Sequence, residues 1–102
     1  MARASSGMDL NGQIAALLRD FAAIQKTKQS MWGYKRAASA VLALEEPIAS
    51  FLQADGTLRK IPNIGPSSTR VIVEVLQDTR CIELMRDFIR KNSSLWNEDI
   101  GT

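Results

Sequence analysis

Hydrophobic residues recur at three- and four-residue spacing along most of the chain, which is the pattern of amphipathic helices. The first such segment begins at Asp9 or Asn11, either of which can cap a helix, and it fades at residues 28–30. Its apolar positions are Ile14, Leu17, Leu18, Phe21 and Ile24. The pattern therefore predicts a first helix, preceded by a flexible tail over residues 1–8.

A second helix is predicted from Ser30 or Gly33 to about Leu44. Its inward positions are Tyr34, Ala37, Ala38, Val41 and Leu42. Pro47 stands where a third, short helix would begin, because proline suits the first turn of a helix. The inner face of that short helix is predicted to be Ile48, Phe51 and Leu52.

Turn-forming residues divide the segment that follows. Asp55-Gly56 stops the short helix, and Thr57 is expected to cap a single helical turn over residues 58–61. Residues 62–65, Pro-Asn-Ile-Gly, form a tight turn, and Pro66 opens the next helix, which ends near residues 78–79. Its inward positions are Ile72, Val75 and Leu76, and those of a fifth helix, ending near Asn92, are Ile82, Met85, Phe88 and Ile89.

The predicted fold is all-α, a compact bundle of four to five short helices containing one helix-hairpin-helix motif. Two-residue alternation over the length of a strand is absent, so no sheet is predicted. The domain is expected to span residues 9–91, between tails at residues 1–8 and 92–102.

The amino-acid composition restricts the kinds of catalytic and metal site that the chain can form. The 102 residues include no histidine and a single cysteine, Cys81, which lies in a helical pattern and is expected to be a small core residue. Histidine-dependent acid–base catalysis, histidine-activated nucleophiles and zinc clusters are therefore not expected. No apolar run is long enough to span a membrane and the amino terminus has no apolar core, so we expect a cytoplasmic or nucleoid-associated location.

The net charge of +2 is small, but its distribution is uneven. No acidic residue lies between Asp20 and Glu45, or between Asp55 and Glu74. The basic residues of these two windows are Lys26, Lys28, Lys35, Arg36, Arg59, Lys60 and Arg70. The windows could form one positive face, and a solvated helix surface is the alternative interpretation.

The turn at residues 62–65 has the chemistry of a phosphate site. Asn63 and Gly65 tolerate positive φ, and Gly65 is predicted to adopt it. Ile64 would anchor the turn in the core, and the helix beginning at Pro66 presents free backbone N–H groups. Ser67 and Ser68 are small and can donate hydroxyl hydrogen bonds. The candidate DNA-binding residues are Lys35, Arg59, Lys60, Asn63, Ile64, Gly65, Pro66, Ser67, Ser68 and Arg70.

Ile61-Pro62-Asn63-Ile64-Gly65 resembles the Ile-Pro-Gly-Ile-Gly hairpin of helix-hairpin-helix proteins. Together with Tyr34-Lys35-Arg36-Ala37-Ala38, Pro47-Ile48 and Asp55-Gly56-Thr57-Leu58, it is similar to the amino-terminal domain of the DNA polymerase X family and of bacterial proteins with a polymerase-and-histidinol-phosphatase (PHP) domain. The resemblance covers residues 10–85. It implies DNA repair, phosphate contacts around Ile64, Gly65 and Ser67, and a monovalent cation held by the carbonyls of Arg59, Ile61 and Ile64.

The sequence departs from this family at two positions. Asn63 replaces the first glycine of the hairpin, and Val71 stands where the polymerase beta branch carries its Schiff-base lysine. We therefore expect a sequence-independent DNA-binding module that is not an enzyme, with any catalysis located in another domain or a partner chain. A protein-interaction domain of the same fold and a residual abasic-site lyase are the alternatives.

Overall fold

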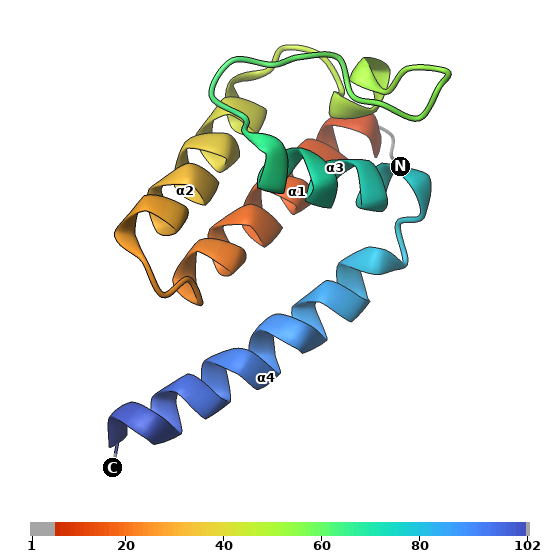
Figure 1. Cartoon of the computed structure of the whole chain (residues 1–102). Helices are drawn as coiled ribbons and strands as arrows, with labels where there is room; N and C mark the ends of the chain where they lie inside the picture. The colour runs from red at the N-terminus through yellow and green to blue at the C-terminus, as the bar shows by residue number, and fades with distance from the viewer. Residues whose placement is uncertain (1–5, 102) are drawn as a thin grey trace.

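The computed structural model describes the backbone of residues 6–101 and the side chains of residues 9–92. Within this part of the chain the helices are α1 (Ser6–Ala23), α2 (Lys28–Ala43), α3 (Pro66–Gln77) and α4 (Cys81–Gly101), with a 3₁₀ turn, η1, at Ile48–Phe51. α1 and α2 lie side by side, α3 crosses them, and α4 runs along the other side of the bundle (Figure 1). The all-α prediction is confirmed.

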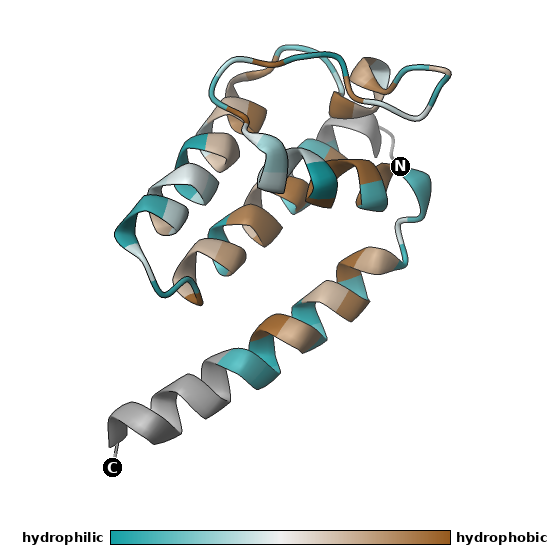
Figure 2. Ribbon diagram, viewed as in Figure 1, coloured by the Kyte–Doolittle hydropathy of each residue, from teal (hydrophilic) through white to brown (hydrophobic). Residues whose placement is uncertain are grey.

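The core forms where the apolar stripes of the helices meet. Along the described parts of the helices, hydrophobic residues recur between hydrophilic ones, as burial of one face requires (Figure 2). The buried cluster consists of Ile14, Ala15, Leu17, Leu18, Ala37, Ala38, Val41, Ile48, Ile61, Val71, Ile72, Val75, Ile82 and Ile89. Most of these were predicted from spacing alone, whereas Leu42 and Phe88, also predicted to face inward, are half exposed. Cys81, expected in the core, is only partly buried.

The helix boundaries correct several predictions. α1 begins at Ser6, ahead of both predicted caps, so residues 6–8 of the predicted tail are helical; residues 1–5 lie outside the described part of the chain. α2 begins at Lys28 because Thr27 caps it, its side chain accepting a hydrogen bond from the Ser30 N–H at 3.1 Å. α4 continues to Gly101, beyond the predicted end at Asn92.

Asn11 joins α1 to the start of the long connection between α2 and α3. Its side chain is 3% exposed, donates to the Glu46 carbonyl at 3.0 Å and accepts from the Ile48 N–H at 2.7 Å. Asn11 was predicted as a helix cap, but it lies within α1 and binds backbone far along the chain. The side chain therefore satisfies buried polar groups that no regular element could pair.

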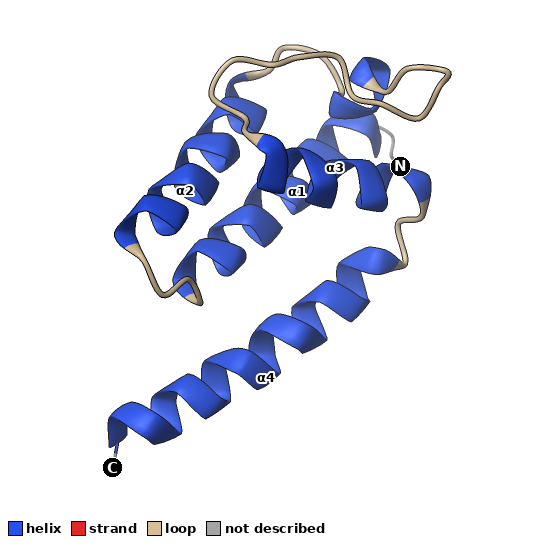
Figure 3. Cartoon of the chain, in the orientation of Figure 1, coloured by secondary structure: helices blue, strands red, loops and turns tan. Residues whose placement is uncertain are grey.

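The connection from residue 44 to residue 65 is mostly loop (Figure 3). The predicted third helix is only η1, and residues 58–61, predicted as a helical turn, are not helical. Leu52 and Leu58 form an isolated antiparallel bridge, the Arg59 N–H donates to the Phe51 carbonyl at 2.8 Å, and the Gln53 N–H donates to the Thr57 carbonyl at 2.7 Å. A single helical turn is costly to nucleate. Hydrogen bonds to the backbone groups of residues 51–53, which η1 leaves unpaired, are therefore more favourable than the predicted turn.

Candidate nucleic-acid interface

The turn before α3 is shaped by Asn63. Among the described residues that are not glycine, it alone has positive φ, at 71°, and the Ile64 N–H closes the turn on the Ile61 carbonyl at 3.2 Å. Asparagine is one of the few residue types that tolerates this conformation. Ile64 is partly buried against the core, as predicted, and Ile61 is buried, so both anchor the turn.

Gly65 is the N-cap of α3, with φ −89° and ψ −175°. The prediction that Gly65 has positive φ is therefore wrong, since this extended conformation is open to any residue. What the glycine provides is space: a Cβ added there would have no heavy atom within 4 Å. No side chain caps the helix, so the free N–H groups of its first turn remain available to a ligand.

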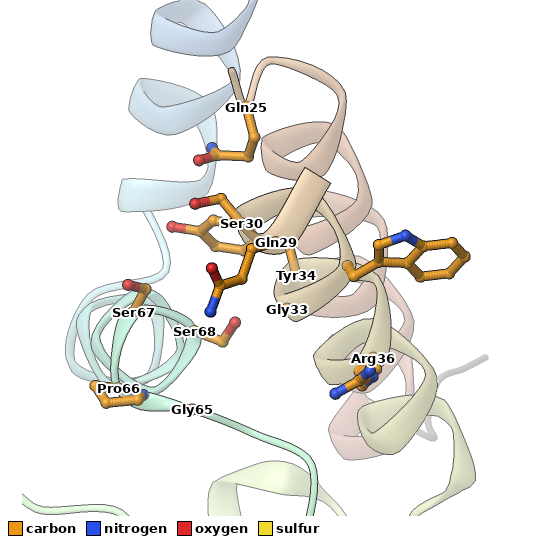
Figure 4. A pocket seen from close by; sticks show the side chains of 11 residues that line it. Gln25, Gln29, Ser30, Gly33, Tyr34, Arg36, Gly65, Pro66, Ser67 and Ser68 are labelled. Carbon is orange, nitrogen blue, oxygen red and sulfur yellow. The ribbon is translucent and has the colours of Figure 1, made fainter. Parts of the chain in front are cut away.

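The amino terminus of α3 faces α2 across a cleft of about 630 Å³, called here the α2–α3 cleft. Gln29 and Tyr34 extend from α2 toward α3, and the Ser68 hydroxyl points back toward α2 (Figure 4). Ser68 is 4% exposed, and its hydroxyl forms no hydrogen bond with a described residue. The lining is Gln25, Gln29, Ser30, Trp32, Gly33, Tyr34, Arg36, Gly65, Pro66, Ser67 and Ser68. The residues lining the cleft thus include one cation and no carboxylate.

Two internal contacts fix the walls of this cleft. The Tyr34 ring stacks on Phe21 of α1, with ring centroids 5.6 Å apart and planes inclined by 20°. The Gln25 amide donates from Nε2 to the Phe21 carbonyl at 2.8 Å, which leaves its oxygen free to accept. The phenol and the amide are therefore held in place before any ligand arrives.

A second, shallower hollow of about 440 Å³, called here the α2 groove, lies between α2 and the hairpin turn. Trp32 and Arg36 line both this groove and the α2–α3 cleft. The other lining residues of the groove are Lys35, Ser39, Ala40, Ala43 and Asn63. The outer face of α2 and the turn at Asn63 thus belong to one continuous surface.

The structure separates the predicted cations. Lys35 lies in the α2 groove with its Nζ 5.2 Å from the centre of the Trp32 ring. The Arg59 guanidinium lies over the Phe51 ring, at 4.4 Å, and Arg59, Lys60 and Arg70 are exposed but line neither hollow. Of the basic residues predicted to bind DNA, Lys35 is therefore the one that lines a hollow, in the groove beside Asn63.

Four residues that line the hollows were not predicted as site residues: Gln25, Gln29, Trp32 and Arg36. A signal for part of this set was present, because Trp32, Lys35, Arg36 and Ser39 share one face of a helix at three- and four-residue spacing. Which side of the hairpin this face would meet depends on how α2 and α3 pack. The sequence of either helix alone does not determine this packing.

Ion pairs occur elsewhere on the molecule. Among the described residues they join Arg80 to Asp78, Arg86 to Glu83 and Arg90 to Asp87. Hydrogen bonds from the side chain and backbone of Arg80 hold the pKa of the Asp78 carboxyl below its usual range. None of the described ion pairs involves the basic residues of the two acid-free windows, so those charges are available to an external anion.

The described residues hold no group of three or more histidine, cysteine or acidic side chains that could bind a metal ion. Val71, at the position where the polymerase beta branch has its lysine, is 8% exposed. No helix in the described part of the chain combines the length and the apolar character needed to cross a membrane.

Comparison with known proteins identifies the family of this chain. Neither the curated proteins nor the solved structures gave a match to the chain. A family model described as a helix-hairpin-helix domain matches residues 9–81. This range includes the turn, α3 and every residue that lines the two hollows. Domains of this kind generally bind nucleic acid. The chain belongs to the helix-hairpin-helix family.

Proposed function

We propose that this domain binds the phosphate backbone of DNA without regard to base sequence, through the amino terminus of α3. The observation that carries the proposal is the Gly65 cap. It leaves the free N–H groups of the first helical turn uncovered, at the positive end of the helix dipole, beside a cleft without carboxylates. A phosphate oxygen fits such a site because it accepts hydrogen bonds and carries negative charge.

Neighbouring groups complete the phosphate site. The Ser67 and Ser68 hydroxyls lie in the first turn of α3, and the Ser68 hydroxyl is buried without a described partner. Arg36 lines the cleft and Lys35 lies in the adjoining groove. Contacts of this kind position a strand but do not read its bases, so binding is expected to be independent of sequence.

The finer family assignment is part of the proposal. The segment Tyr34-Lys35-Arg36-Ala37-Ala38 and the hairpin support a domain of the type found in polymerase X and PHP proteins, with a role in DNA repair. Catalysis would then belong to another domain or a partner chain. On the same resemblance, the carbonyls of Arg59, Ile61 and Ile64 would hold a monovalent cation. The Ile61 carbonyl already accepts from the Ile64 N–H and keeps one lone pair for that cation.

The test is a salt series on two duplexes of unrelated sequence. Affinity should fall linearly with the logarithm of salt concentration and be equal for the two duplexes. Gly65→Ala should weaken both by at least about ten-fold, because its methyl group would extend into the open space at the N-cap, next to the first turn of α3. Its stability should change by less than about 1 kcal/mol.

Gly12→Ala is the matched control. Gly12 also has open space around its Cβ position, but it lies in α1 and lines neither hollow. This variant should bind DNA like the unsubstituted protein. Equal binding by Gly65→Ala would remove α3 from the interface. Absence of any DNA binding would favour a protein-docking role, for which α4 exposes Leu84 and Phe88.

A further inference from the structure

Trp32 is a large aromatic side chain placed where burial does not explain it. It lies on α2 with 53% of its surface exposed. The residue lines both the α2–α3 cleft and the α2 groove. An indole at the junction of two hollows is available for contact with a flat, polarisable ligand.

The surroundings of this indole are cationic. The Lys35 Nζ lies 5.2 Å from the ring centre, over one face of the indole, and Arg36 borders the same two hollows. No acidic residue lines either hollow, and no described ion pair neutralises Lys35 or Arg36. An aromatic ring within a positive groove is the combination that proteins use for single-stranded nucleic acid.

We propose that Trp32 is a stacking platform for an unpaired nucleobase of DNA. This inference rests on the proposed function, because the phosphates of the same strand would lie on the amino terminus of α3 and beside Lys35 and Arg36. The charge of the surface selects an anionic strand, and the indole selects the flat face of a base. Stacking reads no hydrogen-bonding edge, so it is compatible with sequence-independent binding.

A preference for DNA structure follows. In a duplex the faces of each base are covered by its neighbours, so only an unpaired base can stack on Trp32. The α3 amino terminus meets phosphates in both kinds of DNA. The domain should therefore bind a single strand, or the unpaired part of a gap, more tightly than the phosphate contacts alone would allow.

The test compares three probes of matched charge. They are an oligothymidylate, a strand of the same length made of abasic residues, and a fully paired duplex with the same number of phosphates. Trp96→Phe makes Trp32 the sole tryptophan, and its fluorescence then reports stacking directly. The oligothymidylate should quench this fluorescence, whereas the abasic strand and the duplex should leave it nearly unchanged.

Substitutions give the second readout. Trp32→Ala should weaken binding of the oligothymidylate by on the order of ten-fold and leave the other two probes nearly unchanged. Trp32→Phe should retain part of the preference. Leu42→Ala is the matched control, because Leu42 is also a half-exposed apolar residue of α2 but lines neither hollow.

Quenching by the abasic strand equal to that by the oligothymidylate would overturn the inference. So would an equal loss on all three probes in Trp32→Ala, since that would make Trp32 a structural or purely electrostatic element. The two proposals fail separately: duplex binding that survives Gly65→Ala contradicts the phosphate site, whereas quenching by the oligothymidylate alone still supports Trp32.

Discussion

Asn63 and Gly65 have exchanged the roles that their residue types suggest. The positive φ of the turn falls on Asn63, at 71°, whereas Gly65 is extended and contributes only the absence of a side chain. A left-handed conformation costs most residues about 1–2 kcal/mol, and asparagine less because its short polar side chain can bond locally. Substitutions at the two positions should therefore have different consequences.

Asn63→Gly should preserve the fold and bind DNA with equal or higher affinity, because glycine adopts positive φ freely and removes a side chain from the α2 groove. Asn63→Ala should lower the free energy of unfolding by about 1 kcal/mol. Urea unfolding and duplex titrations measure the two effects. A clear loss of affinity in Asn63→Gly would show that the asparagine amide makes its own contact with DNA.

The prediction that the domain does not cleave abasic sites depends on Val71. An imine requires an amine near the sugar aldehyde, and Val71 is an aliphatic side chain buried against the core. The unsubstituted protein should give no borohydride-trapped adduct with abasic DNA above the background of surface lysines. Val71→Lys should also unfold more easily, because burial penalises the ammonium. A strong adduct mapped to Lys35 or Lys60 would establish the lyase alternative.

At the scale of elements, α2 presents two different faces. Ala37, Ala38 and Val41 are buried in the bundle, whereas Trp32, Lys35 and Arg36 border the hollows. The helical period separates the two sets, so one element contributes to the core and to the candidate interface. The positive charge of the interface is consequently carried by a rigid helix and not by a loop.

Substitution of single basic side chains tests whether α2 carries the positive charge of the interface. If Lys35 or Arg36 contacts a phosphate, its substitution by alanine should lower the salt slope of duplex binding by about 0.9. Lys60 and Arg70 are predicted to act as outer contacts with the same effect, and Arg59 should matter less because its guanidinium lies on Phe51.

Lys26→Ala and Lys28→Ala are the controls for this series. Both residues belong to the first acid-free window and are exposed, but they line neither hollow and, unlike Lys60 and Arg70, do not flank the hairpin in the chain. Their salt slopes should match that of the unsubstituted protein. An equal effect of every lysine would indicate diffuse attraction between the protein and DNA and would argue against a localised site.

At the scale of the whole molecule, Asn11 holds the α2–α3 connection against α1. The connection has few regular hydrogen bonds, yet it leads directly into the turn at Asn63. Through its two hydrogen bonds to the backbone of Glu46 and Ile48, Asn11 fixes the beginning of this long segment. The position of the hairpin therefore depends on a residue of the first helix.

Asn11→Ala should lower the free energy of unfolding by about 1–3 kcal/mol, because the Ile48 N–H would remain buried without a partner. Chemical denaturation measures the loss, and Gln13→Ala, an exposed position of the same helix, should change little. DNA affinity measured well below the unfolding temperature should be reduced much less than in Gly65→Ala. Unchanged stability in Asn11→Ala would mean that solvent replaces these hydrogen bonds without cost.

Local information in the sequence was sufficient for most elements. The spacing of Ile14, Leu17 and Leu18, and that of Ile72 and Val75, identified buried faces that the structure confirms. Pro62, Asn63 and Pro66 marked the turn and the start of α3 because their backbone preferences act over a few residues. These features depend on neighbours along the chain, so the family and its hairpin could be predicted before the fold was known.

Tertiary structure alone decided what distant segments do to one another. The predicted helical turn at residues 58–61 does not form because residues 57–59 pair with backbone at residues 51–53, and Asn11 is buried because residues 46–48 pass over it. An apolar stripe indicates which face of a helix turns inward but not which of its residues the neighbouring helices cover. Leu42 and Phe88 lie in such stripes and remain half exposed. The meeting of Trp32 with the hairpin likewise comes from the packing of α2 against α3, which neither sequence segment specifies by itself.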